Sequence, residues 1–529
     1  MNFDWSTPYP SRRQPILAGN VVATSQPLAV QAGMAMLARG GNAVDAALAA
    51  AITLTIVEPC SNGLGSDLFA IVWDGRELAG LNASGRAPAA VTPQRYAGSA
   101  QIGPRGWEAV TIPGAVSGWV ALSQRHGKLP FADLFVPGIR YARDGFPVSP
   151  VVADKWALAA PLMPPDLGFA EHFLPRGRAP GVGELFACPA MAASMEKIAA
   201  TRGEAFYRGE LAAAMVAHAR AHGAAHALAD FAEHTADWAA PLALDYRGVD
   251  VHEIPPNGQG IAAQMALGIL GNFDLAALPP DSVESQHLQI EAMKLAFADA
   301  HRYVSDPRTM EVTPAALLDR GYLAARAKAI DMKRAQDPPP GEPRAGGTVY
   351  LATADANGMM VSYIQSNYMG FGSGIVVPGT GISLQNRGAG FSLKPGHPNL
   401  VGPGKRPFQT IIPGFLTKDG KPVLSFGVMG GQMQPQGHAQ MVTRIVDYHQ
   451  NPQSASDGPR WIVNNDFSVS VEEGRFAPGV LDELERRGHR IVKPEAAMFG
   501  FGGAQLAWRL EDGYCAGSDH RKDGHAVGY

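Results

Sequence analysis

The segment KRAQDPPPGEPRAGG, Lys333 to Gly347, is followed directly by TVYLATADANG, Thr348 to Gly358. The first part has four prolines, three glycines and no large apolar side chain, so it can form neither a core helix nor a core strand. The second part begins with an alternating strand pattern, Thr348 to Ala354, and its turn leads into another apolar run, Met359 to Ile364. We predict a central β-hairpin that is entered from a proline-rich linker. Such an arrangement makes sense if the linker is to be cut, because the cut creates a new N-terminus on a strand.

The regions around this hairpin predict helices early in the chain and strands later. Gln26 to Ile56 is rich in Ala and Leu and is interrupted before Asn42, which is typical of two packed helices, the second of them capped by Asn42. Further helices are predicted at Ser285 to Val304 and Ala439 to His449, and further strands at Phe69 to Trp73, Gly379 to Ser383, Ile411 to Leu416, Pro422 to Phe426 and Phe467 to Val471. This order favours a layered α+β or sandwiched α/β architecture.

The composition excludes several classes of protein. With 46% hydrophobic and 17% charged residues, the 529-residue chain has enough apolar material for a large core. A net charge of −4 gives no basic footprint for nucleic acid, and no apolar stretch is long enough to span a membrane. The cysteines, Cys60, Cys188 and Cys515, form no zinc or disulfide pattern, and we expect no metal and no cofactor. Because the first residues include no apolar signal segment, we expect a cytoplasmic protein, although a chain that had lost its native signal peptide would look the same.

Thr348 is a candidate nucleophile because a terminal threonine carries its own base. A threonine hydroxyl is weakly nucleophilic unless a base lies beside it, and the α-amino group of the same residue can serve once that residue begins a chain. The reference pKa of an α-amine is about 7.7–8.0, so part of it is unprotonated near neutral pH. The Thr348 hydroxyl can make this terminus by attacking the Gly347 carbonyl, and Gly346 and Gly347 ease the strained backbone that this requires. Taken alone, a threonine at the start of a strand is most often structural, so the rest of the chain decides.

Blocks along nearly the whole chain resemble the γ-glutamyltransferase family of N-terminal-nucleophile hydrolases. They are GGNAVDAALAAAITLTIVEPCSNGLG (Gly40 to Gly65), VTIPGAVSGWVALSQRHGKLP and YARDGF (within Val110 to Phe146), EAMKLAFAD (Glu291 to Asp299), TVYLATADANG (Thr348 to Gly358), FGSGIVVPGTGISLQN, GKRPFQTIIP and GVMGGQ. Because these independent blocks occur in the family's order, chance is a poor explanation for the likeness.

The resemblance implies a four-layer αββα sandwich and a proenzyme that cuts itself between Gly347 and Thr348. Residues 1–347, including the linker 333–347, would form a large subunit and residues 348–529 a small one, interleaved as a heterodimer whose further pairing stays open. The resemblance also implies acyl transfer through a Thr348-bound intermediate. Ser366 falls where the family has a hydroxyl that bonds the nucleophile, and Gly430 and Gly431 fall where backbone N–H groups form the oxyanion hole.

The sequence departs from the family where a glutamyl substrate is held. The acid that binds the substrate's amino group falls on Gly390, and the arginine that binds its carboxylate falls on Ser84. Arg86, two positions on, is our first candidate for a carboxylate, and Arg387 and Arg406 are the next.

Other positions expected to line the substrate pocket also differ from the family. The family's serine pair is replaced by Gln409 and Thr410, and an asparagine by Tyr368. A pocket with no acid for an amino group and a bulky Tyr368 favours a short carboxylated amide. This pattern resembles the oxamate amidohydrolase branch of the family.

Other functions remain open at this stage. A γ-glutamyl transpeptidase or glutathione hydrolase with a rearranged pocket is the nearest alternative, and a cephalosporin-acylase-like activity on longer side chains is a weaker one. A non-enzymatic binding protein that keeps the scaffold uncleaved is the alternative from another class. Motifs of zinc proteases, serine hydrolases and phosphate-binding loops are incomplete in this chain. His287, on the predicted central helix, is expected to be structural.

Overall fold

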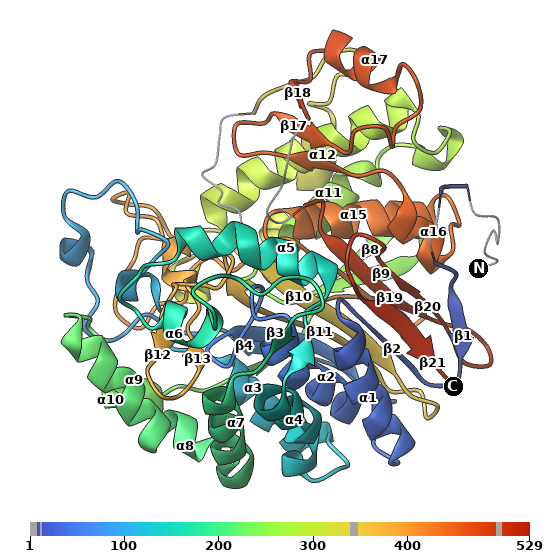
Figure 1. Ribbon diagram of the computed structural model, residues 1–529. Coiled ribbons are helices and arrows are strands. Elements are labelled where there is room, and N and C mark those ends of the chain that lie inside the picture. Colours follow the sequence, from blue (N-terminus) through green and yellow to red (C-terminus); the bar gives the residue numbers. More distant parts are fainter. Residues whose placement is uncertain (1–7, 11–12, 339–346, 494–499) are drawn as a thin grey trace.

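Two stacked seven-stranded sheets, covered by helices on both outer faces, form the centre of the computed structural model, which describes residues 8–10, 13–338, 347–493 and 500–529 (Figure 1). The first sheet has the order β21 (His525–Gly528), β2 (Val21–Thr24), β10 (Gly347–Ala354), β11 (Met360–Tyr368), β3 (Asp67–Trp73), β4 (Leu78–Ala83) and β7 (Asp237–Ala239). The second has the order β1 (Ile16–Ala18), β20 (Tyr514–Ser518), β19 (Gly503–Arg509), β15 (Lys421–Met429), β14 (Gly414–Lys418), β9 (Val249–Glu253) and β8 (Leu242–Tyr246). The predicted four-layer αββα sandwich is confirmed.

Each sheet combines strands from both sides of Thr348. In the first sheet β10 lies between β2 and β11, so the strand headed by Thr348 pairs with an early strand on one side and with its own hairpin partner on the other. In the second sheet β15 pairs with β14 and β19, and β14 pairs with the earlier strand β9. The segments before and after Thr348 therefore form one folded unit.

Separate layers of helices bury the two outer faces. The first sheet is covered by α1 (Pro27–Ala38), α2 (Ala43–Val57), α3 (Ala115–His126), α4 (Val136–Asp144) and α7 (Pro189–Thr201). The second is covered by α11 (Gly260–Leu270), α12 (Val283–Tyr303), α15 (Met433–Val446) and α16 (Pro452–Asp457). Between the sheets lies a third apolar cluster, which includes Phe69, Tyr350, Ile364 and Phe415. Burying both faces of each sheet accounts for strands that are apolar on both sides.

Helix α2 shows how local sequence and packing agree. Every residue of α2 is buried, and its alanines allow close packing against α1. Asn42 Oδ1 accepts from the N–H of Asp45 and Asp45 Oδ2 accepts from the N–H of Asn42, each at 3.0 Å, which is a capping box. The predicted pair of helices and its Asn42 cap are confirmed.

The remaining elements surround this core. They are α5 (Pro150–Ala159), α6 (Phe169–Phe173), α8 (Glu204–Tyr207), α9 (Glu210–Ala221), α10 (Leu228–Ala232), α13 (Pro314–Leu317), α14 (Arg320–Ala327), α17 (Val480–Arg486), β5 (Phe146–Pro147), β6 (Leu185–Phe186), β12 (Val376–Val377), β13 (Ile382–Ser383), β16 (Trp461–Val463), β17 (Val469–Val471) and β18 (Ile491–Val492). None of the helices in the described ranges is both long and apolar enough to cross a membrane.

Three predicted strands are shorter than expected. The run 467–471 is a strand only at β17, and Phe467 has a φ of 61°. The run 379–383 is a strand only at β13, because Gly379 and Gly381 have φ angles of 70° and 64° and so form a turn. The run 411–416 becomes a strand only at Gly414, since Pro413 has no N–H to donate to a ladder. Of the predicted linker, residues 339–346 lie outside the described residues.

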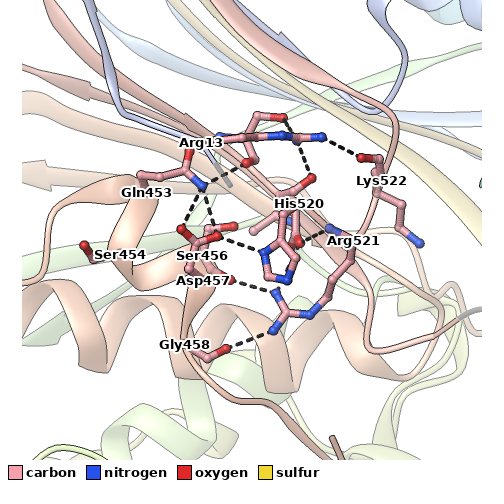
Figure 2. A network of polar contacts seen from close by, with 12 residues as sticks. Arg13, Gln453, Ser454, Ser456, Asp457, Gly458, His520, Arg521 and Lys522 are labelled. Carbon is pink, nitrogen blue, oxygen red and sulfur yellow. Dashed lines mark hydrogen bonds and ion pairs between the residues drawn. The ribbon is translucent and has the colours of Figure 1, made fainter. Parts of the chain in front are cut away.

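The turn between β20 and β21 is fixed by a polar network (Figure 2). His520 Nδ1 lies 2.9 Å from Asp457 Oδ1, and Gln453 Nε2 donates to the same oxygen at 3.1 Å. Arg13 Nη2 donates to the carbonyl oxygen of Lys522 at 2.7 Å, which joins the N-terminal segment to this turn. The network therefore connects both ends of the chain to α16.

Candidate active site

Thr348 lies in a β-bulge near the start of β10. Gly347 pairs with Tyr368 and Val349 pairs with Gln365, so two residues of β11, Ser366 and Asn367, face the single residue Thr348. A bulge bends the ladder and redirects side chains, and bulges are common beside active sites. The Thr348 residue is only 3% exposed. The bond between Gly347 and Thr348 is thus part of the sheet.

Two side chains hold the Thr348 hydroxyl. Thr348 Oγ1 donates to Ser366 Oγ at 3.3 Å, and Gln434 Nε2 donates to Thr348 Oγ1 at 3.1 Å. Ser366 Oγ also accepts from the N–H of Tyr368 at 2.7 Å, which fixes its position. The structure brings together Thr348 and Ser366, as the sequence predicted. It adds Gln434, which we did not identify from the sequence.

Gln434 is oriented by the neighbouring backbone. Its Oε1 accepts from the N–H of Ile412 at 3.0 Å, which leaves Nε2 directed at Thr348. Gln434 lies in the first turn of α15, three residues after Gly431. This closeness to GVMGGQ was the signal in the sequence that could have revealed it.

Gly430 and Gly431 form the turn between β15 and α15. Their φ angles are 127° and 61°, which favour glycine, and their carbonyl oxygens accept from the N–H groups of Met433 and Gln434. Within the described part of the chain, neither glycine N–H donates to an acceptor. The N-terminus of a helix favours negative charge, so this turn can receive an oxyanion. It is connected to Thr348 through Gln434.

Arg387 and Tyr368 form the side of the site next to the hairpin. Arg387 is in a short 3-10 helix, η7 (Arg387–Gly390), and its guanidinium carbon lies 4.7 Å from the centre of the Tyr368 ring. Arg387 Nη1 donates to Thr410 Oγ1 at 2.7 Å. Tyr368 has a φ of 79°, a left-handed conformation that costs a residue with a side chain about 1–2 kcal/mol. Strain of this kind is concentrated at functional sites.

Asp67 is a buried acid that we did not predict. Its Oδ1 accepts from the N–H groups of Gly85 and Gly114, and Gln409 Nε2 donates to Oδ2 at 3.0 Å. Burial raises the pKa of Asp67 to about 6, opposed by the positive charge of Arg387 and by those N–H groups. Asp67 pairs with Ser366 between β3 and β11, so it lies one strand away from the residue that accepts from the Thr348 hydroxyl. A single acid that opens an apolar strand was the available signal.

The other two candidate arginines are already paired. Arg86 Nη2 lies 3.2 Å from Asp237 Oδ2 and Nη1 lies 4.0 Å from Asp306 Oδ2, and its side chain is 35% exposed. Arg406 Nη1 lies 2.5 Å from Asp237 Oδ2, and its Nε donates to the carbonyl oxygen of Ser84 at 3.0 Å. These contacts direct both arginines to chain carboxylates rather than to Thr348.

No residue cluster in the described ranges combines three His, Cys, Asp or Glu side chains in a way that could hold a metal ion. His287 lies in the core, where Nδ1 is 2.8 Å from His489 Nε2 and Nε2 is 2.9 Å from the carbonyl oxygen of Asp331. Both nitrogens of His287 therefore have structural partners.

Comparison with known proteins finds similarity along nearly the whole chain. The sequence profile of the gamma-glutamyltranspeptidase family matches residues 29–529. The glutathione hydrolase-like YwrD proenzyme of Bacillus subtilis is 37% identical over 517 residues, which cover 96% of this chain and 98% of that protein. The oxamate amidohydrolase proenzyme of Klebsiella pneumoniae is 36% identical, covering 95% and 97%. The crystal structure of a cephalosporin acylase from Bacillus halodurans has a TM-score of 0.94 and 46% identity, and covers 100% of this chain and 99% of that one.

Proposed function

The chain belongs to the gamma-glutamyltranspeptidase family, and we propose that it is an autoprocessing N-terminal threonine amidohydrolase that acts on a short carboxylated amide. One observation carries the proposal: the Thr348 hydroxyl lies at the head of a central strand, in a bulge, between Ser366 and Gln434. The relatives named above as proenzymes support maturation by cleavage.

Maturation is the first reaction of Thr348. Its hydroxyl oxygen attacks the Gly347 carbonyl, the peptide C–N bond breaks, and the Thr348 nitrogen leaves as the α-amine. The resulting ester between Gly347 and Thr348 Oγ1 is then hydrolysed by water, which yields a Gly347 carboxylate and restores the hydroxyl. The donor Gln434 Nε2 stabilises negative charge on the attacking oxygen.

Turnover repeats the same chemistry on a substrate. The α-amine of Thr348 takes the proton from Oγ1 as that oxygen attacks the amide carbonyl. The N–H groups of Gly430 and Gly431 receive the oxyanion, which is worth about 10²–10³ in rate for each well-placed donor. The leaving amine takes the proton and departs, and water hydrolyses the acyl ester on Thr348.

The choice of a short carboxylated amide rests on the walls of the site. At Gly390, where the family has an acid for the substrate's amino group, an added Cβ would lie 2.8 Å from the carbonyl oxygen of Phe408, so the backbone leaves no room for one. Asp67 is an acid beside Ser366, and its oxygens already accept from Gly85, Gly114 and Gln409. An α-ammonium group would therefore be buried without a counter-ion, which is costly.

Two other substrate classes follow from the relatives. A γ-glutamyl amide is the first alternative, because one of the relatives is named glutathione hydrolase-like. A longer acyl side chain is the second, because of the similarity to a cephalosporin acylase. Ammonia release from oxamate, nitroaniline release from γ-glutamyl nitroanilide and hydrolysis of an acyl cephalosporin distinguish the three.

The maturation step is tested first by mass. The purified wild-type protein should give two fragments, the second beginning TVYLATAD, while Thr348→Ala should give one chain of 55.8 kDa without activity. Thr353→Ala is a matched control on the same strand, since Thr353 Oγ1 donates to the carbonyl oxygen of Ala43, and it should still be cut. An active wild-type enzyme that stays uncut, or a Thr348→Ala chain that matures, would refute the proposal.

A further inference from the structure

Arg387 is a buried cation that no carboxylate contacts in the part of the chain that the structure describes. The residue has 0% exposure, and Nη1 is the guanidinium nitrogen that has a partner, Thr410 Oγ1. Among the described residues, Nε and Nη2 have no hydrogen-bond partner. Asp67 acts on Arg387 as a charge without contacting it. Leaving two donors unpaired inside a protein is energetically costly, and the cost is larger when the group is charged.

The guanidinium of Arg387 stays charged in this environment. Burial lowers its pKa to about 10, opposed by the negative charge of Asp67. At neutral pH the group is therefore protonated and requires an anion. The ring of Tyr368 covers one face of the guanidinium, which directs any anion to the edge of the plane.

The two unpaired nitrogens are adjacent on one edge of the guanidinium. Elsewhere in this chain the same edge binds a carboxylate with both oxygens: Arg521 Nε and Nη2 donate to Glu472 at 2.6 and 2.7 Å. Arg308 Nε and Nη2 bind Asp306 in the same way, at 2.9 and 2.7 Å. Parallel N–H donors of this kind match a carboxylate in geometry and charge.

We propose that Arg387 is the specificity-determining residue of the site and that its Nε and Nη2 bind the substrate's carboxylate as a bidentate pair. The inference rests on the proposed function and prefers Arg387 to our first candidate, Arg86, which is partly exposed and already paired with Asp237 and Asp306. Arg406, the other candidate, is likewise paired with Asp237.

The position of Arg387 also limits the length of the substrate. Tyr368, which stacks on it, lies opposite Gly347 in the ladder and donates its N–H to Ser366, the partner of Thr348. Thr410, which binds Nη1, is two residues from Ile412, whose N–H orients Gln434 towards Thr348. Tyr368 and Thr410 are thus each linked to the Thr348 hydroxyl through Ser366 or Gln434. These contacts favour a substrate whose carboxylate is close to the scissile carbonyl, as in the monoamide of a short dicarboxylic acid.

The decisive experiment compares a charged and a neutral amide of the same size. Oxamate carries one carboxylate and oxamide, its diamide, carries none. Arg387→Met should raise KM for oxamate by about 10²-fold, because the bidentate charged pair is lost, and should leave oxamide hydrolysis and maturation within about threefold of wild type. Arg387→Lys keeps the charge but loses the paired donors, so its KM for oxamate should lie between those of the wild type and Arg387→Met. Equal losses on both substrates would overturn the assignment.

A binding measurement keeps this test independent of turnover. Oxalate should raise the thermal midpoint of the wild-type protein and of Arg302→Met, a control that removes an exposed arginine paired with Glu311. It should have no such effect on Arg387→Met. A failure of maturation with oxalate binding retained would count against the proposed function alone. If Arg86→Met rather than Arg387→Met abolishes the oxalate effect, the anchor is Arg86 and the inference is wrong.

Discussion

Two fully buried arginines in this molecule have opposite surroundings. Arg460 and Arg387 are both 0% exposed, and burial lowers the pKa of each to about 10. Arg460 Nη2 lies 2.6 Å from Asp519 Oδ2, Nη1 donates to the carbonyl oxygen of Phe501 at 2.8 Å, and Nη2 also donates to Ser456. Arg387 has one neutral partner, Thr410. Burial alone therefore does not distinguish the two arginines. Arg460 also leaves its Nε without a hydrogen-bond partner among the described residues, so the difference lies in the carboxylate that contacts Arg460 and in the second unpaired nitrogen of Arg387.

The same contrast extends to the regions around the two residues. Around Arg460 the neighbouring Arg521 binds both Glu472 and Asp519, and it continues into the network that holds the C-terminal turn (Figure 2). Around Thr348 the arginine edge and the N–H groups of Gly430 and Gly431 are unpaired within the described residues. A site that binds a negatively charged group needs hydrogen-bond donors without partners in the protein. These unpaired donors destabilise the protein when no ligand is bound.

The largest effect is expected from exchanging each arginine for methionine. Arg460→Met breaks a buried ion pair and should lower the free energy of unfolding by about 3–5 kcal/mol, while kcat of the folded enzyme is retained. Arg387→Met removes a charge that contacts no carboxylate among the described residues and has the neutral Thr410 as a partner, so its stability should equal or exceed that of the wild type. Urea unfolding of the two processed variants, side by side with the wild type, measures the difference. Similar losses in both would remove the distinction drawn between them.

The next effect concerns the open donors at the turn before α15. At Gly430, with φ of 127°, an added Cβ would lie 3.1 Å from Gly502 Cα and from Met433 Cβ. Gly430→Ala should displace the oxyanion donors and lower kcat by about 10²–10³. Gly420→Ala, at a turn between β14 and β15 with φ of 71° and open space around it, controls for backbone strain. Comparable kcat values for the two variants would argue against an oxyanion role.

The smallest effect is a pH dependence of anion binding. Burial raises the pKa of Asp67 to about 6, while the positive charges of Arg387 and Arg406 oppose the shift. Above this pH the ionised Asp67 repels an incoming carboxylate, and below it the repulsion is lost. Oxalate binding, measured by calorimetry at constant ionic strength, should therefore tighten up to about tenfold as pH falls from 7 to 5, since one pKa unit corresponds to about 1.4 kcal/mol.

A matched variant and a choice of readout isolate this effect. Asp67→Asn cannot ionise and should show oxalate binding that varies little over the same range. Binding is the required readout because the α-amine of Thr348, with a reference pKa of about 7.7–8.0, also changes kcat with pH. Affinity that rises with pH in the wild type would contradict the assignment of Asp67.

The elements with strong local signals were predicted well. The hairpin around Thr348, the pair of helices with its Asn42 cap and the central helix α12 occur where the pattern placed them. Errors occurred where backbone conformation overrides hydrophobicity, as at Gly379 and before Pro413. The four-layer arrangement came from the family resemblance rather than from the periodicity.

The site was predicted only in part, for a physical reason. Ser366 and the glycine pair stand at fixed positions in recognisable blocks. Gln434, in contrast, contacts Thr348, which is 86 residues away in the sequence. Asp67 contacts Gln409, which is 342 residues away. Such contacts depend on how the sheets stack. Arg86 ranked first because it is close in sequence to the position that the family uses, and only the tertiary structure shows its carboxylate partners.

The presence of early and late strands in the same sheet has a consequence for refolding of the protein. A chain that is still continuous regains its structure at a rate that does not depend on dilution. Once it is cut before Thr348, β2 and β10 belong to different molecules, and the two pieces must meet before either sheet can form. Recovery from denaturant then becomes a second-order process that fails at low concentration. Strand connectivity therefore favours folding of the sheets before any cut at this position.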